Sequence, residues 1–205
     1  MPTVYFATTN VGKVESVTRH LAPAGISVVH EPLELEEPRS DSLVTIARAK
    51  VQQAYGMIKK PCVAIDAGFY INALNEWPGT YVNHELKHLG LEGILTLVAG
   101  KPRDCYFLHC LAYKDDTVGT SYFVSKASGM LESYPKGDPE KKHWSKLFQI
   151  FIPTNTTKTL AEMKPEEYEQ WSARQGKVFY QDIARLINHR AQLWEEMSSP
   201  KEKSL

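Results

Sequence analysis

The stretch Val4-Tyr5-Phe6-Ala7-Thr8-Thr9-Asn10-Val11-Gly12-Lys13 decides how the chain begins to fold. Its four apolar or small residues predict a buried strand that ends at Thr8. A helical pattern follows directly, with apolar residues at Val11, Val14, Val17 and Leu21. Unpaired N–H groups at the helix start and the charge of Lys13 together favour an anion. An ordinary N-capped helix after a first strand explains the same residues equally well.

The composition is typical of a globular protein with one core. The chain has 205 residues, of which 42% are hydrophobic, and this length supports one sizeable core rather than two full domains. We therefore expect a single domain over residues 1–197 and a flexible tail over 198–205. Lysine plus arginine and aspartate plus glutamate number 24 each. No overall field would then attract nucleic acid or an anionic membrane, and we expect neither as a partner.

Apolar runs and cysteines indicate the compartment. The sequence contains no amino-terminal secretion signal and no apolar stretch of about 18 residues, so we expect neither export nor membrane insertion. The three cysteines, Cys62, Cys105 and Cys110, are odd in number and lie in predicted strands. This pattern predicts buried free thiols rather than a disulfide framework. A reducing cytoplasm is the location that fits.

Strand and helix patterns alternate along the chain and predict an α/β fold. Strand patterns cover residues 26–30, 63–68, 104–113, 120–131 and 148–152, and helical patterns cover 43–55, 84–89, 91–99 and 178–197. The acidic segment 31–41 lies between a strand and a helix, where active-site loops occur. The polar segment 133–146 predicts a lid or pocket wall. Thr159-Leu160-Ala161-Glu162 has the spacing of a capping box.

Several motifs occur together in one order. Thr8-Thr9-Asn10-Val11-Gly12-Lys13 resembles the T-x-N-x-x-K signature of the inosine triphosphate pyrophosphatase family, also called the Ham1-like nucleotide pyrophosphatases. The further matches are Asp66-Ala67-Gly68, Trp77-Pro78-Gly79-Thr80-Tyr81, Gly90-Leu91-Glu92-Gly93-Ile94, Phe151-Ile152-Pro153, Lys158-Thr159-Leu160-Ala161-Glu162-Met163 and His189-Arg190. Each motif alone is weak, but their shared order covers nearly the whole chain and is specific.

The resemblance implies a fold and an activity. The implied fold is an elongated α/β structure, with a mixed sheet, flanking helices and two lobes around a central groove. Family members are commonly dimers that hydrolyse purine nucleoside triphosphates to monophosphate and pyrophosphate, favouring hypoxanthine and xanthine bases. They use Mg²⁺, so we expect Mg²⁺ for this chain, with Mn²⁺ as the alternative. Such a reaction depends mainly on positioning and charge neutralisation, because the protein has little covalent chemistry to perform.

Carried over by position, the resemblance also implies roles for individual residues. Thr8, Thr9, Asn10 and Lys13 correspond to a triphosphate grip, and Lys50 to a lysine near the phosphates. Glu37 (or Glu36, because the loop aligns loosely) and Asp66 correspond to metal-binding carboxylates. The implied catalytic set is Asp66, Lys13 and Glu37. The base would be contacted by Asn188, His189 and Arg190, with Trp144 as the stacking aromatic. Strand-end aspartates such as Asp66 also often cap the following turn.

The sequence departs from the family pattern in three places. Ile65-Asp66 stands where the family has two consecutive acids, which predicts the loss of one metal-site carboxylate, and Ala67 replaces a serine. His143-Trp144-Ser145-Lys146-Leu147-Phe148-Gln149 replaces the G-F-G-Y-D-P run of the purine pocket. The family's K-N-x-x-S-H-R becomes Ala184-Arg185-Leu186-Ile187-Asn188-His189-Arg190. A buried polar side chain that is left without its hydrogen-bond partner disfavours the substrate of the other family members. We therefore expect an altered base preference.

Three other functions remain open. His84-Glu85-Leu86-Lys87-His88 matches the H-E-x-x-H signature of zinc peptidases, in which two histidines one helical turn apart hold zinc. Lys87 and the helix-breaking Gly90 instead favour a solvated surface helix. A family member that binds nucleotide without turnover is the second alternative, favoured by Ile65 and the lost glycine-rich run. A different nucleotide hydrolase activity is the third.

Overall fold

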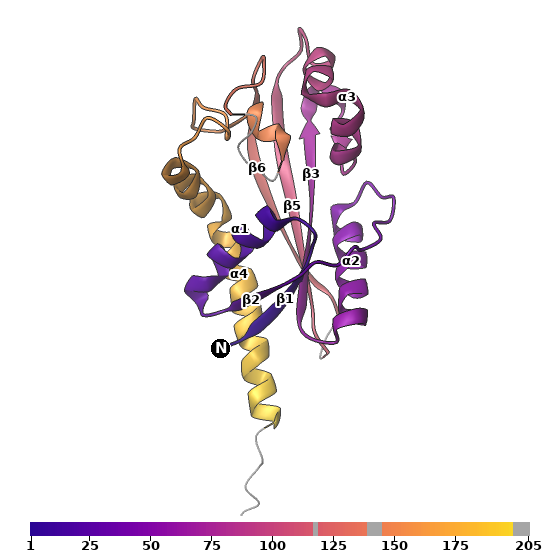
Figure 1. Cartoon of the computed structure of the whole chain (residues 1–205), viewed down its shortest axis with the longest axis vertical. Helices are drawn as coiled ribbons and strands as arrows, with labels where there is room; N and C mark the ends of the chain where they lie inside the picture. The colour runs from indigo at the N-terminus through magenta and orange to yellow at the C-terminus, as the bar shows by residue number, and fades with distance from the viewer. Residues whose placement is uncertain (117–118, 139–144, 199–205) are drawn as a thin grey trace, which may run out of the picture.

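Three long antiparallel strands form the centre of the molecule (Figure 1). The computed structural model describes residues 1–116, 119–138 and 145–198. Its strands are β1 (Thr3–Ala7), β2 (Ser27–Glu31), β3 (Cys62–Ile71), β4 (Pro78–Gly79), β5 (Asp104–Lys114), β6 (Ser121–Leu131) and β7 (Phe151–Pro153). Its α-helices are α1 (Val11–Leu21), α2 (Leu43–Ile58), α3 (Val82–Leu97) and α4 (Pro165–Ser198). Short 3₁₀ turns are η1 (Ala22–Ala24), η2 (Asn72–Leu74) and η3 (Lys146–Gln149).

The sheet is mixed and has seven strands within the described residues. Their order is β2-β1-β3-β5-β6-β7, with β4 paired to β3. Strands β2, β1 and β3 run parallel, whereas β3, β5, β6 and β7 are antiparallel. The β1–β3 ladder holds only Tyr5 opposite Cys62 and Phe6 opposite Val63. Beyond that short ladder β3 continues to Ile71, so the turn that leaves β1 faces the middle of β3.

Opposite faces of β3 pack against different helices, because successive side chains on a strand point to opposite sides. Even-numbered residues such as Ala64 lie in a core with Ala47 and Val51 of α2. Odd-numbered residues such as Val63 and Ile65 lie in a core with α1 and α4. Figure 1 shows α2 on one side of the long strands and α1 with α4 on the other. A third core joins α3 to the far end of β3, β5 and the segment around β7.

The elongated α/β architecture with its mixed sheet confirms the expected fold class. The predicted break between two helical pieces is also confirmed, because Gly90 has φ 67° and interrupts α3. None of the helices that the structure describes combines the length and apolar character needed to cross a bilayer.

Two boundary predictions were wrong. The last helix begins at Pro165 rather than Val178. Proline at the first helical position, followed by Glu166 and Glu167, starts a helix without any apolar signal. The strand expected over 148–152 is instead η3 followed by β7. Thr159 and Glu162 do form the reciprocal capping bonds, but they close a turn rather than start a helix.

Candidate active site

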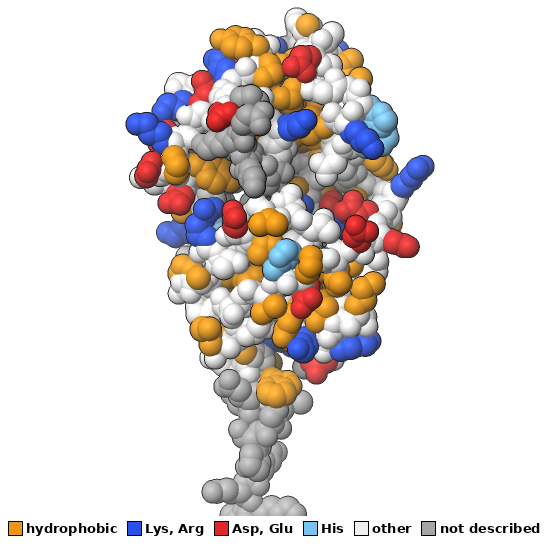
Figure 2. Space-filling view, viewed as in Figure 1, with side chains coloured by type: hydrophobic (Ala, Val, Ile, Leu, Met, Phe, Trp, Pro, Cys, Tyr) orange, Lys and Arg blue, Asp and Glu red, His pale blue; other side chains and the backbone are white. Residues whose placement is uncertain are grey.

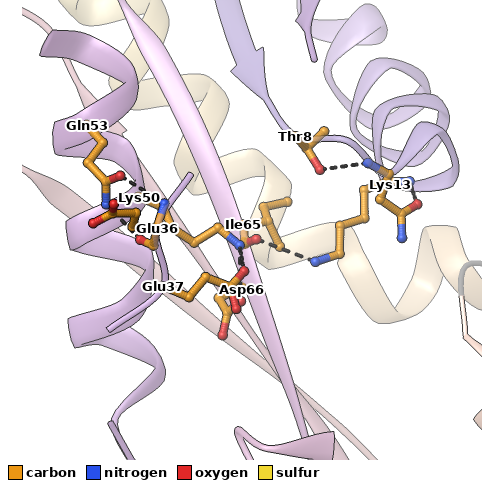
Figure 3. A network of polar contacts seen from close by, with 9 residues as sticks. Thr8, Lys13, Glu36, Glu37, Lys50, Gln53, Ile65 and Asp66 are labelled. Atoms are coloured by element: carbon orange, nitrogen blue, oxygen red, sulfur yellow. Dashed lines mark hydrogen bonds and ion pairs between the residues drawn. The ribbon is translucent and has the colours of Figure 1, made fainter. Parts of the chain in front are cut away.

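Two carboxylates and one ammonium group meet beside the middle of β3 (Figure 3). Asp66 is buried in β3, and its Oδ1 lies 3.3 Å from Nζ of Lys50 in α2. The same Nζ lies 2.6 Å from Oε1 of Glu37, in the loop between β2 and α2. Burial raises the pKa of Asp66, and the Lys50 charge opposes that rise. The structure therefore brings together three residues that the sequence assigns to metal and phosphate binding.

The acidic loop is tied to α2 by its backbone. The backbone N–H of Glu36 donates to Oε1 of Gln53 at 2.9 Å, and Nε2 of Gln53 donates to the Glu36 carbonyl at 2.7 Å. These two bonds hold the loop so that Glu37, and not Glu36, reaches Lys50. Figure 2 shows acidic side chains gathered at the level of this loop. The geometry favours Glu37 over Glu36 as the second carboxylate.

The polar turn after β1 serves first as a helix cap. Oγ1 of Thr8 accepts from the Asn10 N–H, and Oδ1 of Asn10 accepts from the Lys13 N–H, both at 3.1 Å. Asn10 is thus the N-cap of α1. His30 of β2 lies 2.8 Å from the Thr8 carbonyl through Nε2 and fixes the start of the turn. Thr9 is exposed at its tip.

Lys13 connects this turn to β3. Its Nζ donates to the carbonyl of Ile65 at 3.5 Å, next to Asp66 in the chain. Burial and the Lys50 charge lower the pKa of Lys13 to about 8, while Asp66 and Glu37 oppose that shift. Its contact with the Ile65 carbonyl places the Lys13 ammonium next to the Asp66–Lys50 pair (Figure 3). Lys13 and Asp66 thus lie around one site rather than on opposite sides of the molecule.

A pocket of about 80 Å³ opens on the other side of Lys13. Its walls come from α1, from the sheet and from the first half of α4, including Ser16, His20, Ile65, His109, Ser125, Tyr168, Trp171, Ser172 and Gln175. Burial and the Lys13 charge lower the pKa of His109 to about 4, so its imidazole is neutral near pH 7. The ring of His20 stacks on Tyr180 of α4 at 4.2 Å. The pocket is therefore aromatic on the α4 side and mixed in polarity on the sheet side.

Known proteins are similar to this chain over most of its length. A model of the Ham1 family matches residues 4–178. The chain is 32% identical over 176 residues to a "dITP/XTP pyrophosphatase" of Pyrococcus horikoshii, which covers 85% of this chain and 91% of that protein. It is 30% identical over 168 residues to an "Inosine triphosphate pyrophosphatase" of Yarrowia lipolytica, covering 80% and 85%. The chain belongs to the Ham1 family.

Solved structures show the same fold. A HAM1 protein from Coxiella burnetii superposes with a TM-score of 0.74 at 18% identity, covering 92% of this chain and 100% of that one. The Staphylococcus aureus Ham1 protein gives 0.72 at 21% identity, covering 88% and 97%. The mixed sheet and its flanking helices are therefore those of the Ham1 fold.

Position 65 of this Ham1 protein faces away from the carboxylates. Ile65 points to the α1–α4 side, where it lines the pocket and packs with Val17 and Phe179. Asp66 points to the α2 side, toward Lys50. An acid at position 65 would therefore enter the pocket beside Lys13, not the Glu37–Asp66 pair. The expectation that Ile65 removes a carboxylate from that pair is corrected by the alternation of side chains along β3.

The predicted base-contacting residues near the carboxyl terminus lie elsewhere. Nδ2 of Asn188 donates to the carbonyl of Ala24 at 3.2 Å, and His189 is exposed. Arg190 lines a separate pocket with Thr3, at the opposite end of β1 from Thr8. The structure thus separates these three residues from Lys13 and the pocket beside it.

Sequence reasoning missed the part of α4 that does line the pocket. Tyr168, Trp171, Ser172 and Gln175 all contribute to it. The signal was present: Tyr168-Glu169-Gln170-Trp171-Ser172-Ala173-Arg174 keeps the serine and arginine of the family's K-N-x-x-S-H-R. This segment also follows shortly after the Lys158–Met163 match in the sequence. The His-Arg pair at 189–190 comes much later in the chain.

Trp144 is the aromatic residue that the sequence predicts to stack on the base. Trp144 and His143 lie outside the described residues. Phe148, which replaces the acid of the glycine-rich run, is 2% exposed and belongs to the core around Phe107 and Phe151. That position contributes packing rather than base recognition.

The H-E-x-x-H segment does not form a metal centre. The rings of His84 and His88 do lie close together, with centroids 4.3 Å apart, and Nδ1 of His84 is 3.2 Å from Oε1 of Glu85. Both histidines are exposed, and α3 breaks at Gly90. Across residues 1–116, 119–138 and 145–198, no three His, Cys, Asp or Glu side chains are grouped to hold a metal ion. The zinc-peptidase alternative therefore lacks a third ligand.

Proposed function

We propose that this protein hydrolyses a purine nucleoside triphosphate to the monophosphate and pyrophosphate. Relatives named dITP/XTP pyrophosphatase and inosine triphosphate pyrophosphatase support the reaction. The observation that carries it is the convergence of Glu37 and Asp66 on one cation beside Lys13. Such a site supplies carboxylates for a metal ion and ammonium groups for phosphates.

In this reaction a water oxygen bonds to the α-phosphorus while the bond from that phosphorus to the bridging oxygen of the pyrophosphate breaks. Lys13 and Lys50 neutralise charge on the phosphate oxygens, as does the N-terminal end of α1. Asp66 orients the attacking water, and the water's proton leaves through that carboxylate to solvent. Thr8 and Asn10 hold the turn that positions Lys13, and Thr9 at its exposed tip is open to the triphosphate. Catalysis then depends on placement and charge rather than on a covalent intermediate.

The donor set fits Mg²⁺, or Mn²⁺ in its place. Hard oxygen ligands suit both ions, and two carboxylates already share one cation here. Magnesium is usually held by one or two carboxylates together with waters and substrate phosphates. Glu37 and Asp66 would hold the ion, which would polarise the phosphate oxygens when bound.

We place the base in the pocket beside Lys13. Trp171 and Tyr168 offer flat faces for stacking, and Ser172, Gln175 and neutral His109 offer hydrogen-bonding groups. This set replaces Asn188, His189 and Arg190 in our assignment. Because Tyr168, Glu169 and Ala173 stand where the family's K-N-x-x-S-H-R has lysine, asparagine and histidine, the base preference is altered from that of dITP/XTP enzymes.

We also retain the homodimer and the cytoplasmic location as proposals. The outer face of β6 carries Tyr122, Val124 and Met130, which are 47%, 51% and 52% exposed and suit contact with a second copy. The three cysteines are free and buried, as in a protein of a reducing compartment. Light scattering would show a mass near twice 23.2 kDa for a dimer.

The test is pyrophosphate release by purified protein with Mg²⁺ and separate deoxyinosine, inosine, xanthosine, guanosine and adenosine triphosphates. We expect release from at least one, with a ranking that shows the base preference. Release from none would refute the hydrolase proposal. Calorimetric binding of the same nucleotides without turnover would then establish the alternative, a nucleotide-binding protein that has lost catalysis.

A further inference from the structure

The cation between the two carboxylates belongs to the protein itself. Nζ of Lys50 lies 2.6 Å from Glu37 Oε1 and 3.3 Å from Asp66 Oδ1 (Figure 3). Both carboxylates therefore point at one place, and an ammonium group occupies that place. A divalent cation bound by the same two oxygens would have to lie where the ammonium lies now.

We propose that Lys50 holds the metal position in the nucleotide-free protein and leaves it when the metal–nucleotide complex binds. This inference rests on the Glu37–Asp66 metal site of the proposed function. An ammonium and a divalent cation repel strongly at contact distance in a partly buried site. The two cations therefore exclude one another, and metal alone binds weakly as long as Lys50 stays.

Burial explains why the site carries its own cation. The side chains of Lys50 and Asp66 are only 12% and 10% exposed, whereas that of Glu37 is 56% exposed. A charged carboxylate at such depth needs a positive partner, because burial penalises the charge. Lys50 supplies that partner before metal arrives. Glu37, on the exposed loop, provides the open side through which metal can enter.

The charges of the cluster match such an exchange. Lys13 and Lys50 balance Glu37 and Asp66, so the four groups carry no net charge together. A metal–nucleotide complex brings a cation for the carboxylates and a polyanion for the lysines. The flexible four-carbon stem of lysine lets the ammonium move from a carboxylate to a phosphate while α2 stays in place. Each carboxylate then pairs with the metal ion instead of a lysine, and each lysine pairs with a phosphate instead of a carboxylate.

Binding of Mn²⁺ to the nucleotide-free protein, followed by electron paramagnetic resonance, tests the exchange directly. We expect Lys50→Met to bind Mn²⁺ about tenfold or more tightly than the unmodified protein, since the competing charge is gone. Arg48→Met is the matched control: it removes an exposed positive charge two residues away, near Tyr122, and should leave the affinity unchanged. Lys50→Met/Asp66→Asn should lose the gain, because one carboxylate is neutral.

Equal or weaker Mn²⁺ binding by Lys50→Met would overturn the inference. If circular dichroism shows that this variant does not fold, Lys50→Gln gives the same comparison, because its amide donates a hydrogen bond to Asp66 without a charge. Hydrolysis is not needed for either measurement. A protein that turns over no triphosphate yet binds Mn²⁺ more tightly as Lys50→Met would refute the proposed function and leave the exchange standing.

Discussion

The two faces of β3 differ completely at two neighbouring residues. On the α2 side, Asp66 meets Lys50 and Glu37 in a cluster of full charges. On the α1–α4 side, Ile65 lines a pocket with aromatic side chains and a neutral His109. Lys13 reaches the strand from the end of β1, and its charge acts on groups of both faces. One strand thus separates the groups suited to a metal and phosphates from those suited to a base.

This division shows how a single substitution should be interpreted. A motif of two adjacent acids suggests a shared metal site, but adjacent strand residues cannot point to the same side. The residue at position 65 therefore affects the pocket and the surroundings of Lys13, while Asp66 affects the cation. Substitutions in the two regions should therefore affect different steps of binding and catalysis.

The largest expected effect on the rate comes from substitutions at residues 65 and 66. Asp66→Asn should lower kcat by roughly 10²-fold or more, because it removes a charge that orients the water and attracts the metal. Ile65→Asp should leave the metal concentration for half-maximal rate within about twofold, although it adds a carboxylate one residue away. Pyrophosphate release against metal concentration measures both. A metal requirement that shifts as strongly in Ile65→Asp as in Asp66→Asn would show that the two faces act as one site.

The next comparison sets the first half of α4 against its second half. Trp171→Leu keeps an apolar side chain but loses the flat stacking face, and should raise KM about tenfold, in line with the stacking energy of a base on an aromatic ring. His189→Ala should stay within about twofold of the unmodified protein, because His189 is exposed and away from the pocket. Steady-state kinetics with the preferred triphosphate distinguishes the two. The reverse ranking would return the base site to residues 188–190.

The fold was largely predictable, and its main errors have local causes. Apolar runs located the long strands, and Gly90 located the break in α3 because its φ of 67° suits glycine. The start of α4 was missed because residues 165–177 are mostly charged or polar, with Tyr168 and Trp171 as their large aromatic side chains. Proline followed by two glutamates was the only start signal. The 3₁₀ turn before β7 was missed because a short apolar run reads equally well as a strand.

The candidate site was predictable in one half only. Lys13, Lys50, Glu37 and Asp66 were assigned from ordered motifs near strand ends and on one helix, and the structure brings them together. The pocket was not assigned correctly, because the family's S-H-R was matched to Asn188-His189-Arg190 rather than to Ser172-Ala173-Arg174. Packing between segments about 150 residues apart then places the α4 wall beside α1. The stack of His20 on Tyr180 is one such contact. No local pattern around His20 indicates this contact, whereas Ser172-Ala173-Arg174 in α4 did carry a motif signal.

A pH profile sharpens the contrast between Lys13 and a permanently charged residue. Burial and the Lys50 charge lower the pKa of Lys13 to about 8, so Lys13 loses its proton as the pH rises through that value. Because only the charged form attracts phosphate, kcat/KM should fall above pH 8 by about tenfold per pH unit. Arginine stays protonated, so Lys13→Arg should move this fall to higher pH. An identical inflection in both proteins would assign it to another group.

The smallest effect separates the two roles of the turn after β1. Asn10 and Ser42 are the N-caps of α1 and α2, each accepting from a backbone N–H three residues on. Asn10→Ala and Ser42→Ala should each lower the free energy of unfolding by about 1 kcal/mol, because each helix loses its cap. Only Asn10→Ala should also raise KM, because the Asn10 cap bonds the backbone N–H of Lys13. Denaturant unfolding and kinetics on the same two variants measure both quantities. Equal KM values at equal loss of stability would make the turn an ordinary helix cap and remove it from the phosphate site.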